Sequence, residues 1–254
     1  MRTDIFDFEF SAGSALDIGL IRQSNEDRVI LCPEIGFFAV SDGMGGLPQG
    51  GKTSEIVAEV MPAIVEDLAR EFRGADLSPE RCGAALKEHV RLVSDNIYDT
   101  VNTAGIYFGA TLSCLWLVGA AAVYVNLGDS RGYLLPKYKR TLRQVTEDHN
   151  VAAELVQLGE LTREEAQGHP ASSSLTQFMG MPAPAQPDVF IEPVARGDRL
   201  LLCSDGIHGM LGDREIRRRM RGSKWPNAAC KKLAYAANRA GGHDNIAAII
   251  IKII

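Results

Sequence analysis

The sequence has few cysteines, and none of them is spaced like a metal-binding or redox pair. The 254-residue chain contains five cysteines, an odd number, and no two form a Cys-x-x-Cys pair. We therefore expect neither a structural zinc site nor a framework of disulfide bonds. Cys32, Cys114 and Cys203 lie within apolar runs and are expected to be small buried side chains, which fits a reducing compartment.

Long apolar runs and an excess of positive charge are also missing. The longest apolar stretch, Cys114–Val125, has 12 residues and is interrupted by Gly119, whereas a transmembrane helix needs about 20. Residues Met1–Phe10 alternate acidic and apolar residues, unlike a signal peptide. A net charge of −5 is atypical of proteins that bind nucleic acids or membrane surfaces, and the basic run Arg217–Lys224 is expected to be an exposed helix face. We expect a cytoplasmic protein that binds neither nucleic acid nor membrane.

The composition is that of a globular domain, with 46% hydrophobic and 23% charged residues. Strand patterns come in a run, then two helical patterns, then strands again, with hairpin-length connections. This order predicts an α+β fold of antiparallel sheets with helices packed outside. The strands are expected at 14–21, 28–32, 36–40, 107–118, 121–127, 131–135, 141–145, 189–191, 199–203 and 246–254. The helices are expected at 56–72, from Ser78 to 101, and at 151–158, 213–219 and 227–240.

Four aspartates each follow or precede an apolar strand, next to a glycine-containing turn. They are Asp42, Asp129, Asp205 and Asp244. Gathering several carboxylates in a buried place is prohibitive unless a cation neutralises them. Oxygen ligands alone suit Mg²⁺ or Mn²⁺, and a pair of such ions can activate water for phosphoryl hydrolysis. The pattern therefore indicates a divalent-metal site.

With these motifs the sequence resembles the bacterial form of the PP2C-type (PPM) metal-dependent protein serine/threonine phosphatases. The resemblance runs from about Ser14 to Ile254, and its motifs follow one another in the family's order. They are Gly19–Asp27, Val40–Gly46, Phe108–Leu112, Gly128–Arg131, Thr146–His149, Leu202–Ile207 and Gly242–Ile246.

The resemblance implies a four-layer αββα sandwich, with two central antiparallel sheets flanked by helix pairs. It implies one domain over residues 1–254, with an irregular flap at about 149–187. It also implies the site residues. Asp42 would bridge two ions, the Gly43 carbonyl would complete the second ion's ligands, Asp205 and Asp244 would hold the first, and Glu26 and Asp27 would bind through metal-bound water. Asp129 and Asp205 would hold a weaker third ion, and Arg22 would hold the substrate phosphate through its planar fork of donors.

By the same resemblance, the chain would be an enzyme that hydrolyses phosphoserine and phosphothreonine on proteins. The reaction would be direct attack by a hydroxide that bridges two Mn²⁺ or Mg²⁺ ions. Its partners would be phosphorylated proteins, such as a bacterial Ser/Thr kinase or that kinase's target, and the chain would act as a monomer.

Two departures from the family's pattern bear on these expectations. Met44 replaces the histidine of animal members that is proposed as general acid, and methionine has no proton to give. His149 and His169 are candidates for that role, although loop packing is the simpler interpretation of both. In the flap, Ser172–Ser174 replaces the usual Arg-Asn pair after Pro170, which puts the flap's contacts to substrate in doubt.

Two alternative functions are consistent with parts of the sequence. Residues Gly46–Thr53 match the P-loop pattern of nucleotide-binding proteins, in which Lys52 would reach phosphates and Thr53 would hold Mg²⁺. This interpretation leaves Arg22–Asp27, Asp129 and Asp244 unexplained, and the chain lacks the alternating strands and helices of a parallel sheet. The other alternative is a non-catalytic regulator with the phosphatase fold, although such proteins usually lose metal ligands, and all of them are present here.

Overall fold

The computed structural model describes residues 5–44, 51–72, 77–101, 108–139 and 141–254. Its strands form two antiparallel sheets. The first sheet has the order β1-β11-β10-β7-β8, so the strand nearest each end of the chain lies in the same sheet. Its strands are β1 (Phe10–Asp17), β7 (Arg131–Leu135), β8 (Arg143–Gln144), β10 (Arg199–Cys203) and β11 (Ile246–Ile253).

The second sheet has the order β2-β3-β5-β6-β9, with the short β4 paired to the end of β3. Its middle strands carry apolar residues on both faces because helices cover one side and the first sheet covers the other. Every residue of β5 and β6 is buried. The strands are β2 (Asp27–Cys32), β3 (Phe37–Met44), β4 (Gly109–Ala110), β5 (Leu112–Val118), β6 (Ala121–Leu127) and β9 (Asp188–Pro193).

Two pairs of helices cover the outer faces of the sheets. Helices α1 (Gly51–Glu71) and α2 (Pro79–Val101) pack on the second sheet, and α6 (Asp213–Arg221) and α7 (Pro226–Arg239) pack on the first. Ser78 caps α2 as its sequence predicts, because its Oγ accepts a hydrogen bond from the Arg81 backbone N–H at 3.2 Å. Pro62 lies inside α1 without ending it.

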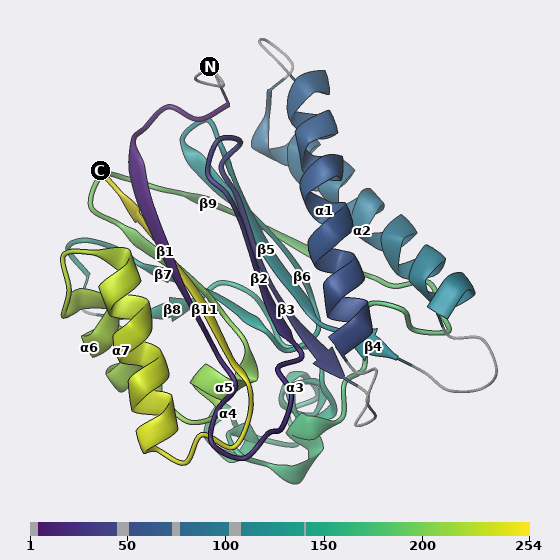
Figure 1. Cartoon of the computed structure of the whole chain (residues 1–254), viewed down its shortest axis with the longest axis vertical. Helices are drawn as coiled ribbons and strands as arrows, with labels where there is room; N and C mark the ends of the chain where they lie inside the picture. The colour runs from purple at the N-terminus through teal and green to yellow at the C-terminus, as the bar shows by residue number, and fades with distance from the viewer. Residues whose placement is uncertain (1–4, 45–50, 73–76, 102–107, 140) are drawn as a thin grey trace.

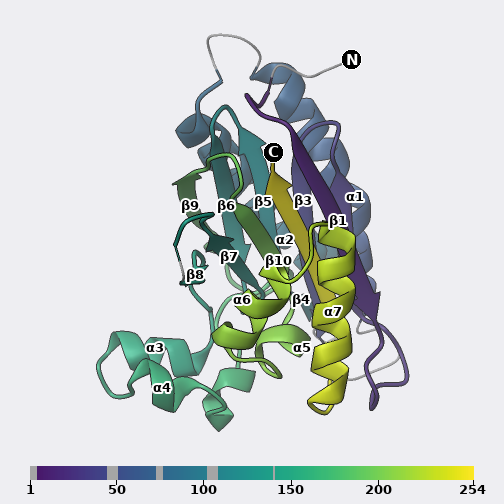
Figure 2. The ribbon, with the colours of Figure 1, turned by 90° about the vertical axis from the view of Figure 1, so that its left-hand side faces the viewer.

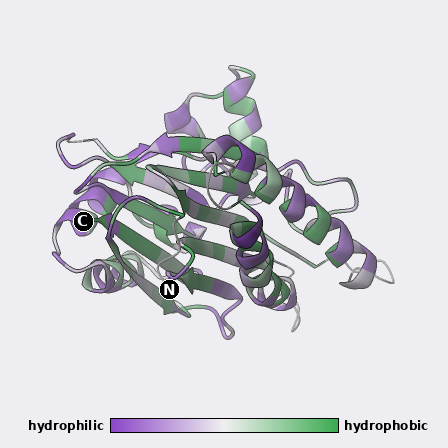
Figure 3. Ribbon diagram, turned by 90° about the horizontal axis from the view of Figure 1, so that it is seen from above, coloured by the Kyte–Doolittle hydropathy of each residue, from purple (hydrophilic) through white to green (hydrophobic). Residues whose placement is uncertain are grey.

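Three buried apolar clusters separate the four layers. One lies between α1–α2 and the second sheet, one between α6–α7 and the first sheet, and one between the two sheets. The cluster between the sheets includes Phe38, Leu115, Leu202 and Ile249. Figure 3 shows apolar residues running through the strands and polar residues on the outward faces of the helices. The expected α+β, four-layer sandwich is confirmed.

The expected flap contains more regular structure than the sequence predicts. It holds α3 (Val151–Gln157), α4 (Arg163–Ala166) and a 3₁₀ turn at Pro170–Ser173. Figure 2 shows α3 and α4 projecting from the body of the molecule at the end where the short helix α5 (Asp205–His208) lies. Any contact that the flap makes with a substrate therefore belongs to that end of the sandwich.

Several expected boundaries differ from those of the structure. The first strand ends at Asp17 and not at Ile21. The chain turns there because Gly19 has a φ of +79° and the Asp17 carboxylate accepts a hydrogen bond from the Gly19 N–H at 2.9 Å. The strand expected at 141–145 shortens to Arg143–Gln144, and α5 was not predicted. Some residues of the expected motifs lie outside the described residues. They are residues 45–46 of the motif Val40–Gly46, residues 46–50 of the P-loop pattern, and Tyr107. Among the described residues, no helix combines the length and apolar character needed to cross a bilayer.

Candidate metal centre

Asp27 and Asp42 face each other across the edge of the second sheet. Asp27 begins β2 and Asp42 lies near the end of β3, and the two are direct partners in the antiparallel register. The Asp42 backbone is fixed by Thr111, whose Oγ1 accepts from the Asp42 N–H at 3.0 Å and whose N–H donates to the Asp42 carbonyl at 2.8 Å. Thr111, between β4 and β5, thus anchors the end of β3 that carries Asp42.

The first sheet contributes Asp205 and Asp244 from two neighbouring strands. Asp205 follows β10 and begins α5, while Asp244 precedes β11. Since β10 and β11 are antiparallel, the end of one and the start of the other lie side by side. A Cβ atom at Gly19 would lie 2.2 Å from the Asp244 carbonyl oxygen, so the turn after β1 approaches Asp244 only because this residue is glycine with a positive φ.

These carboxyls are close enough to raise each other's pKa. Burial, followed by repulsion from Asp27, Asp205, Asp129 and Asp244, raises the pKa of Asp42 well above its usual range. Burial is also the main cause that raises the pKa of Asp27 to about 7 and that of Asp205 to about 6. Hydrogen bonding to the Asp42 carboxyl partly offsets the rise in the pKa of both Asp27 and Asp205, and two carboxyls interact in this way only with a proton or a cation between their oxygens.

Two buried carboxylate oxygens of the cluster lack a hydrogen-bond donor within the described part of the chain. The Asp27 Oδ2 accepts from the Ser204 hydroxyl at 2.7 Å, but its Oδ1 and the Oδ1 of Asp205 are buried without a hydrogen-bond donor among the described residues. A buried carboxylate oxygen without a donor is costly. A divalent cation with oxygen ligands would satisfy both atoms, so the donor set fits Mg²⁺ or Mn²⁺.

The side chains of these aspartates are not arranged as a complete coordination shell for a metal ion. No group of three or more His, Cys, Asp or Glu residues in the described part of the chain is arranged to hold a metal ion. One reason is visible at Asp244, whose Oδ2 accepts a hydrogen bond from Arg22 Nη2 at 2.7 Å. The fit to a metal therefore rests on the orphaned oxygens and on the proximity of the carboxyls, and an ion would have to draw these side chains inward.

Glu26 and Gly43 are tied to the same place through their backbones. The Gly43 N–H donates to the Glu26 carbonyl at 3.1 Å, and the Glu26 N–H donates to Asn245 Oδ1 at 2.8 Å. The Asn245 amide nitrogen also donates to the carbonyls of Ile18 and Ser24. Asn245 thereby joins the loop between β1 and β2 to the start of β11, next to Asp244.

Asp129 approaches from the turn after β6. Burial and then the Asp205 charge raise its pKa to about 8. Its backbone carbonyl accepts from His208 Nε2 at 3.0 Å, and burial lowers the pKa of His208 to about 3, so this imidazole is neutral. The structure thus brings Asp129 near Asp205, where the sequence expects a further ion.

The two candidate general acids are engaged elsewhere. His149 Nδ1 accepts from the Gly128 N–H at 3.2 Å, and its Nε2 lies 3.0 Å from Asp188 Oδ2. His169 Nδ1 accepts from the Ala171 N–H at 3.2 Å, capping the 3₁₀ turn of the flap. Both rings hold loop backbone, and Met44 ends β3 beside Gly109.

Some contributing residues were not singled out from the sequence. Ser204, Asn245 and Thr111 lie within the recognised motifs, but the sequence assigned them no role. Ser204 precedes Asp205 and Asn245 follows Asp244. This adjacency was the available signal, although the Ser204 hydroxyl donates to Asp27 and the Asn245 amide to the carbonyls of Ile18 and Ser24, and not to the neighbouring aspartates.

Comparisons with known proteins find a family model, sequence relatives and solved structures that match the chain. Residues 23–234 match the family model described as Protein phosphatase 2C. The chain is 31% identical over 241 residues to the serine/threonine phosphatase stp of Listeria monocytogenes serotype 4b, covering 93% of each chain. It is similar to the crystal structure of the serine/threonine phosphatase Stp1 from Staphylococcus aureus, with a TM-score of 0.86, 26% identity and coverage of 100% of this chain and 99% of that one. It also resembles the catalytic domain of the serine/threonine protein phosphatase PstP in complex with two manganese ions, with a TM-score of 0.81, 28% identity and coverage of 96% and 98%.

Proposed function

We propose a mechanism and a set of site residues for this chain, which belongs to the protein phosphatase 2C family and is a serine/threonine phosphatase. The observation that carries the proposal is the cluster of aspartates whose carboxyls raise each other's pKa and leave two buried oxygens without donors. Such a cluster is stable and fully ionised only with a bound cation. The manganese ions of the PstP structure support metal dependence here as well.

In this proposal each carboxylate has a distinct place. Asp42 would hold both of two ions, Asp205 and Asp244 would hold the first, and the Gly43 carbonyl would belong to the second. Glu26 and Asp27 would act through bound water, and Asp129 with Asp205 would hold a third ion. The ions, Mn²⁺ or Mg²⁺, supply positive charge that polarises the phosphoryl group and lowers the pKa of water that attacks phosphorus.

The remaining residues bind and orient the substrate. The side chain of Arg22 is 51% exposed and lies beside Asp244. Its guanidinium can therefore turn toward the phosphate oxygens of a phosphoserine or phosphothreonine. Ser204 fixes the orientation of Asp27, and Thr111 fixes the backbone of β3 at Asp42. Because Met44 carries no proton to donate and both candidate histidines hold loop backbone, the proton for the leaving alkoxide comes from solvent water.

The proposal also covers the substrates, the domain organisation and the cellular location. The substrates are phosphoproteins, and we propose that they include a bacterial Ser/Thr kinase or its targets. We propose a single phosphatase domain that acts as a cytoplasmic monomer without nucleic-acid or membrane partners. Pairing of β1 with β11 supports one domain, since it joins the two ends of the chain in one sheet.

The deciding experiment compares hydrolysis of a phosphothreonine peptide with and without Mn²⁺, run beside an ATPase assay. Phosphate release that requires Mn²⁺ and is lost in Asp42→Asn supports the proposal. Asp99→Asn, which removes a carboxylate from the exposed face of α2, is the matched control and is expected to keep full activity. Hydrolysis of ATP in preference to the phosphopeptide would instead support the P-loop interpretation.

A further inference from the structure

A basic cavity lies at the end of the first sheet opposite the metal centre. It is about 440 Å³ in volume, and ten residues line it from the end of β7, the start of β10, the end of β11, the last turn of α6 and the loop before β10. Arg199 begins β10, whereas Asp205 follows its other end. The five residues of β10 therefore separate the cavity from the metal centre by roughly 17 Å.

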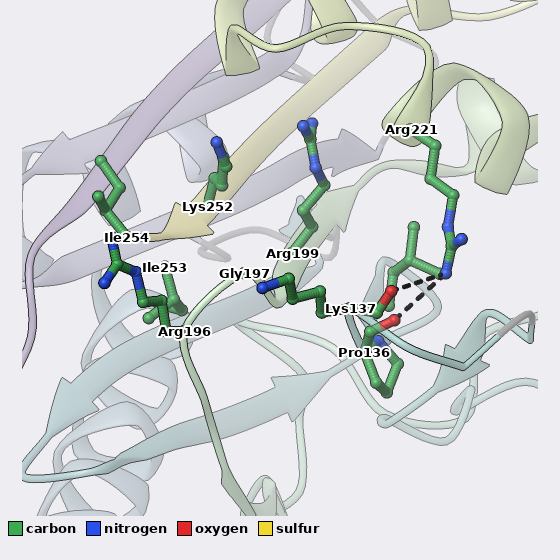
Figure 4. Close-up of a pocket in the computed structure, with 10 residues that line it drawn as sticks. Pro136, Lys137, Arg196, Gly197, Arg199, Arg221, Lys252, Ile253 and Ile254 are labelled. Carbon is green, nitrogen blue, oxygen red and sulfur yellow. Dashed lines mark hydrogen bonds between the residues drawn. The ribbon is translucent and has the colours of Figure 1, made fainter.

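The cavity is lined by five cationic side chains and no acidic one. The cationic residues are Lys137, Arg196, Arg199, Arg221 and Lys252. Figure 4 shows that they come from separate segments of the chain around the same hollow, together with Pro136, Ile253 and Ile254. In a chain with a net charge of −5, such a concentration of positive charge is unexpected from composition.

The carboxylate of Asp198, beside the cavity residue Arg199, does not neutralise this charge. Asp198, which precedes Arg199, is buried, and its two oxygens accept from the backbone N–H groups of Lys137 and Ala195 at 2.9 and 3.0 Å. Among the described residues, no hydrogen bond or ion pair joins the side chain of Arg196 or Lys252 to a partner. Both cations are therefore available to a ligand.

Two arginines are held in place by backbone carbonyls, which leaves their charge uncompensated. Arg199 donates to the carbonyls of Met220 and Ser223 at 2.6 and 2.7 Å, and Arg221 donates to that of Pro136 at 3.3 Å. Burial and then the Arg221 charge lower the pKa of Arg199. These hydrogen bonds to carbonyl oxygens fix the two guanidinium groups without adding negative charge. The guanidinium N–H donors that do not take part in these bonds remain available to a ligand.

The wall of the cavity is also shaped for close approach. Gly197 has a φ of +96°, and a Cβ atom there would lie 2.4 Å from Lys137 Cδ. Only glycine at this position lets the Lys137 stem lie against the turn before β10. The lysine is thereby kept along the cavity wall.

We propose that this cavity binds an anionic ligand carrying two or more phosphate groups. A cluster of fixed arginines with unpaired Arg196 and Lys252 suits several phosphate oxygens at once, since guanidinium groups bind phosphate through paired donors. Its volume is within the range of small-molecule sites. Nucleoside di- and triphosphates carry this chemistry in solution, and phosphorylated inositol headgroups carry it on a membrane.

The test measures binding by calorimetry to metal-free protein in EDTA at physiological ionic strength, with pyrophosphate and ATP as probes. Without metal, the aspartate cluster repels anions, so binding under these conditions reports another site. One arm replaces the soluble probes with phosphatidylcholine vesicles containing phosphatidylinositol bisphosphate. Binding of the soluble probes identifies a free ligand, and binding of the vesicles alone identifies a headgroup.

The cavity variant is Arg196→Gln/Lys252→Gln, and its matched control is Arg214→Gln/Lys231→Gln, which removes the same charge from exposed positions on α6 and α7. Affinity is expected to fall at least tenfold in the cavity variant and to stay at the wild-type value in the control, with phosphatase activity unchanged in both. The proposal is overturned if the wild type binds neither the soluble probes nor the vesicles. It is also overturned if both variants lose affinity equally, because general charge would then explain the binding.

Discussion

Arg22 and Asp244 form an ion pair across the mouth of the metal centre, with 2.7 Å between Nη2 and Oδ2. The proposed function assigns them to different partners, the substrate phosphate and a metal ion. Both side chains are partly exposed, at 51% and 32%, and such a pair contributes only about 0–1 kcal/mol. Asp244 can therefore exchange Arg22 for a metal ion at little cost, which releases the guanidinium for phosphate.

Arg22→Ala is expected to weaken substrate binding without weakening metal binding. A lost charged hydrogen bond costs about 1.5–3 kcal/mol, which corresponds to a loss of roughly 10- to 150-fold in kcat/KM, mainly through KM. Removing the competitor for Asp244 leaves Mn²⁺ affinity unchanged or higher. Kinetics with phosphopeptide and p-nitrophenyl phosphate, together with Mn²⁺ calorimetry, measure the two effects separately.

Arg22→Lys serves as the comparison and should restore activity only in part, since a point charge does not reproduce the paired donors of guanidinium. A variant Arg22→Ala with reduced Mn²⁺ affinity and an unchanged KM would contradict the role assigned to Arg22, whatever the role of the aspartates.

Asp42→Asn and Asp205→Asn are each expected to lower turnover by several orders of magnitude while the protein stays folded. Each removes a metal ligand from the reaction, but each also removes repulsion from the metal-free cluster. Circular dichroism should remain native, and the melting temperature in EDTA should not fall. Near wild-type turnover of either variant in saturating Mn²⁺ would refute the site.

The metal-free protein is expected to lose stability as the pH rises from 5 to 8. The folded-state pKa values of Asp205, Asp27 and Asp129 are raised to about 6, 7 and 8, so the folded state binds more protons than the unfolded state in this range. Stability from such groups is complete below the unfolded pKa of about 4 and is lost as the pH passes the raised values.

Groups with lowered pKa values have the opposite sign. The contribution of Glu215, whose pKa is lowered to about 2, is already complete above pH 5. That of His208, whose pKa is lowered to about 3 from an unfolded value of about 6.5, still grows up to about pH 7, but it is one group against three carboxyls. Thermal unfolding in EDTA at pH 5, 6, 7 and 8 measures the trend. Mn²⁺ binds the ionised carboxylates, so the rise in melting temperature that it causes should grow with pH. A melting temperature in EDTA that climbs from pH 5 to 8 would contradict the proposed burial of the cluster.

Lys52→Ala is expected to be nearly neutral, with kcat/KM for phosphopeptide within about twofold of wild type. Lys52 lies in the first turn of α1, and Thr53 is buried with its hydroxyl away from solvent. ATP hydrolysis by the wild type that disappears in this variant would restore the nucleotide-binding interpretation.

Apolar periodicity and turn residues predicted most elements of the fold. Strands 121–127, 131–135 and 199–203 coincide with β6, β7 and β10 because each is a mostly apolar run bounded by turn residues. The prediction was wrong where a local hydrogen bond decides the conformation. Asp17 ends β1 by accepting from Gly19, and Ser204 begins a helix too short to show a periodicity.

The proximity of the candidate site aspartates was predictable from the sequence, but their contacts were not. Apolar strands ahead of Asp42, Asp129 and Asp205 indicated carboxylates at sheet ends, and the structure brings them within electrostatic reach of one another. The Arg22–Asp244 pair and the bridging by Asn245 join residues more than 200 positions apart. No local pattern encodes such contacts, because they depend on the packing of β1 and β11 in one sheet.

Because β11 lies between β1 and β10, the first sheet cannot form completely on the ribosome until β11 has been synthesised. β1 ends at Asp17, whereas β11, its partner in the sheet, begins at Ile246. At translation rates of about 5–20 residues per second, β1 waits roughly 10–50 s with its hydrogen-bonding edge uncovered. Through that interval the nascent chain has neither Asp244 nor the strand that positions it, so the aspartate cluster cannot assemble before β11 has been made. The growing chain is also most open to aggregation at this edge.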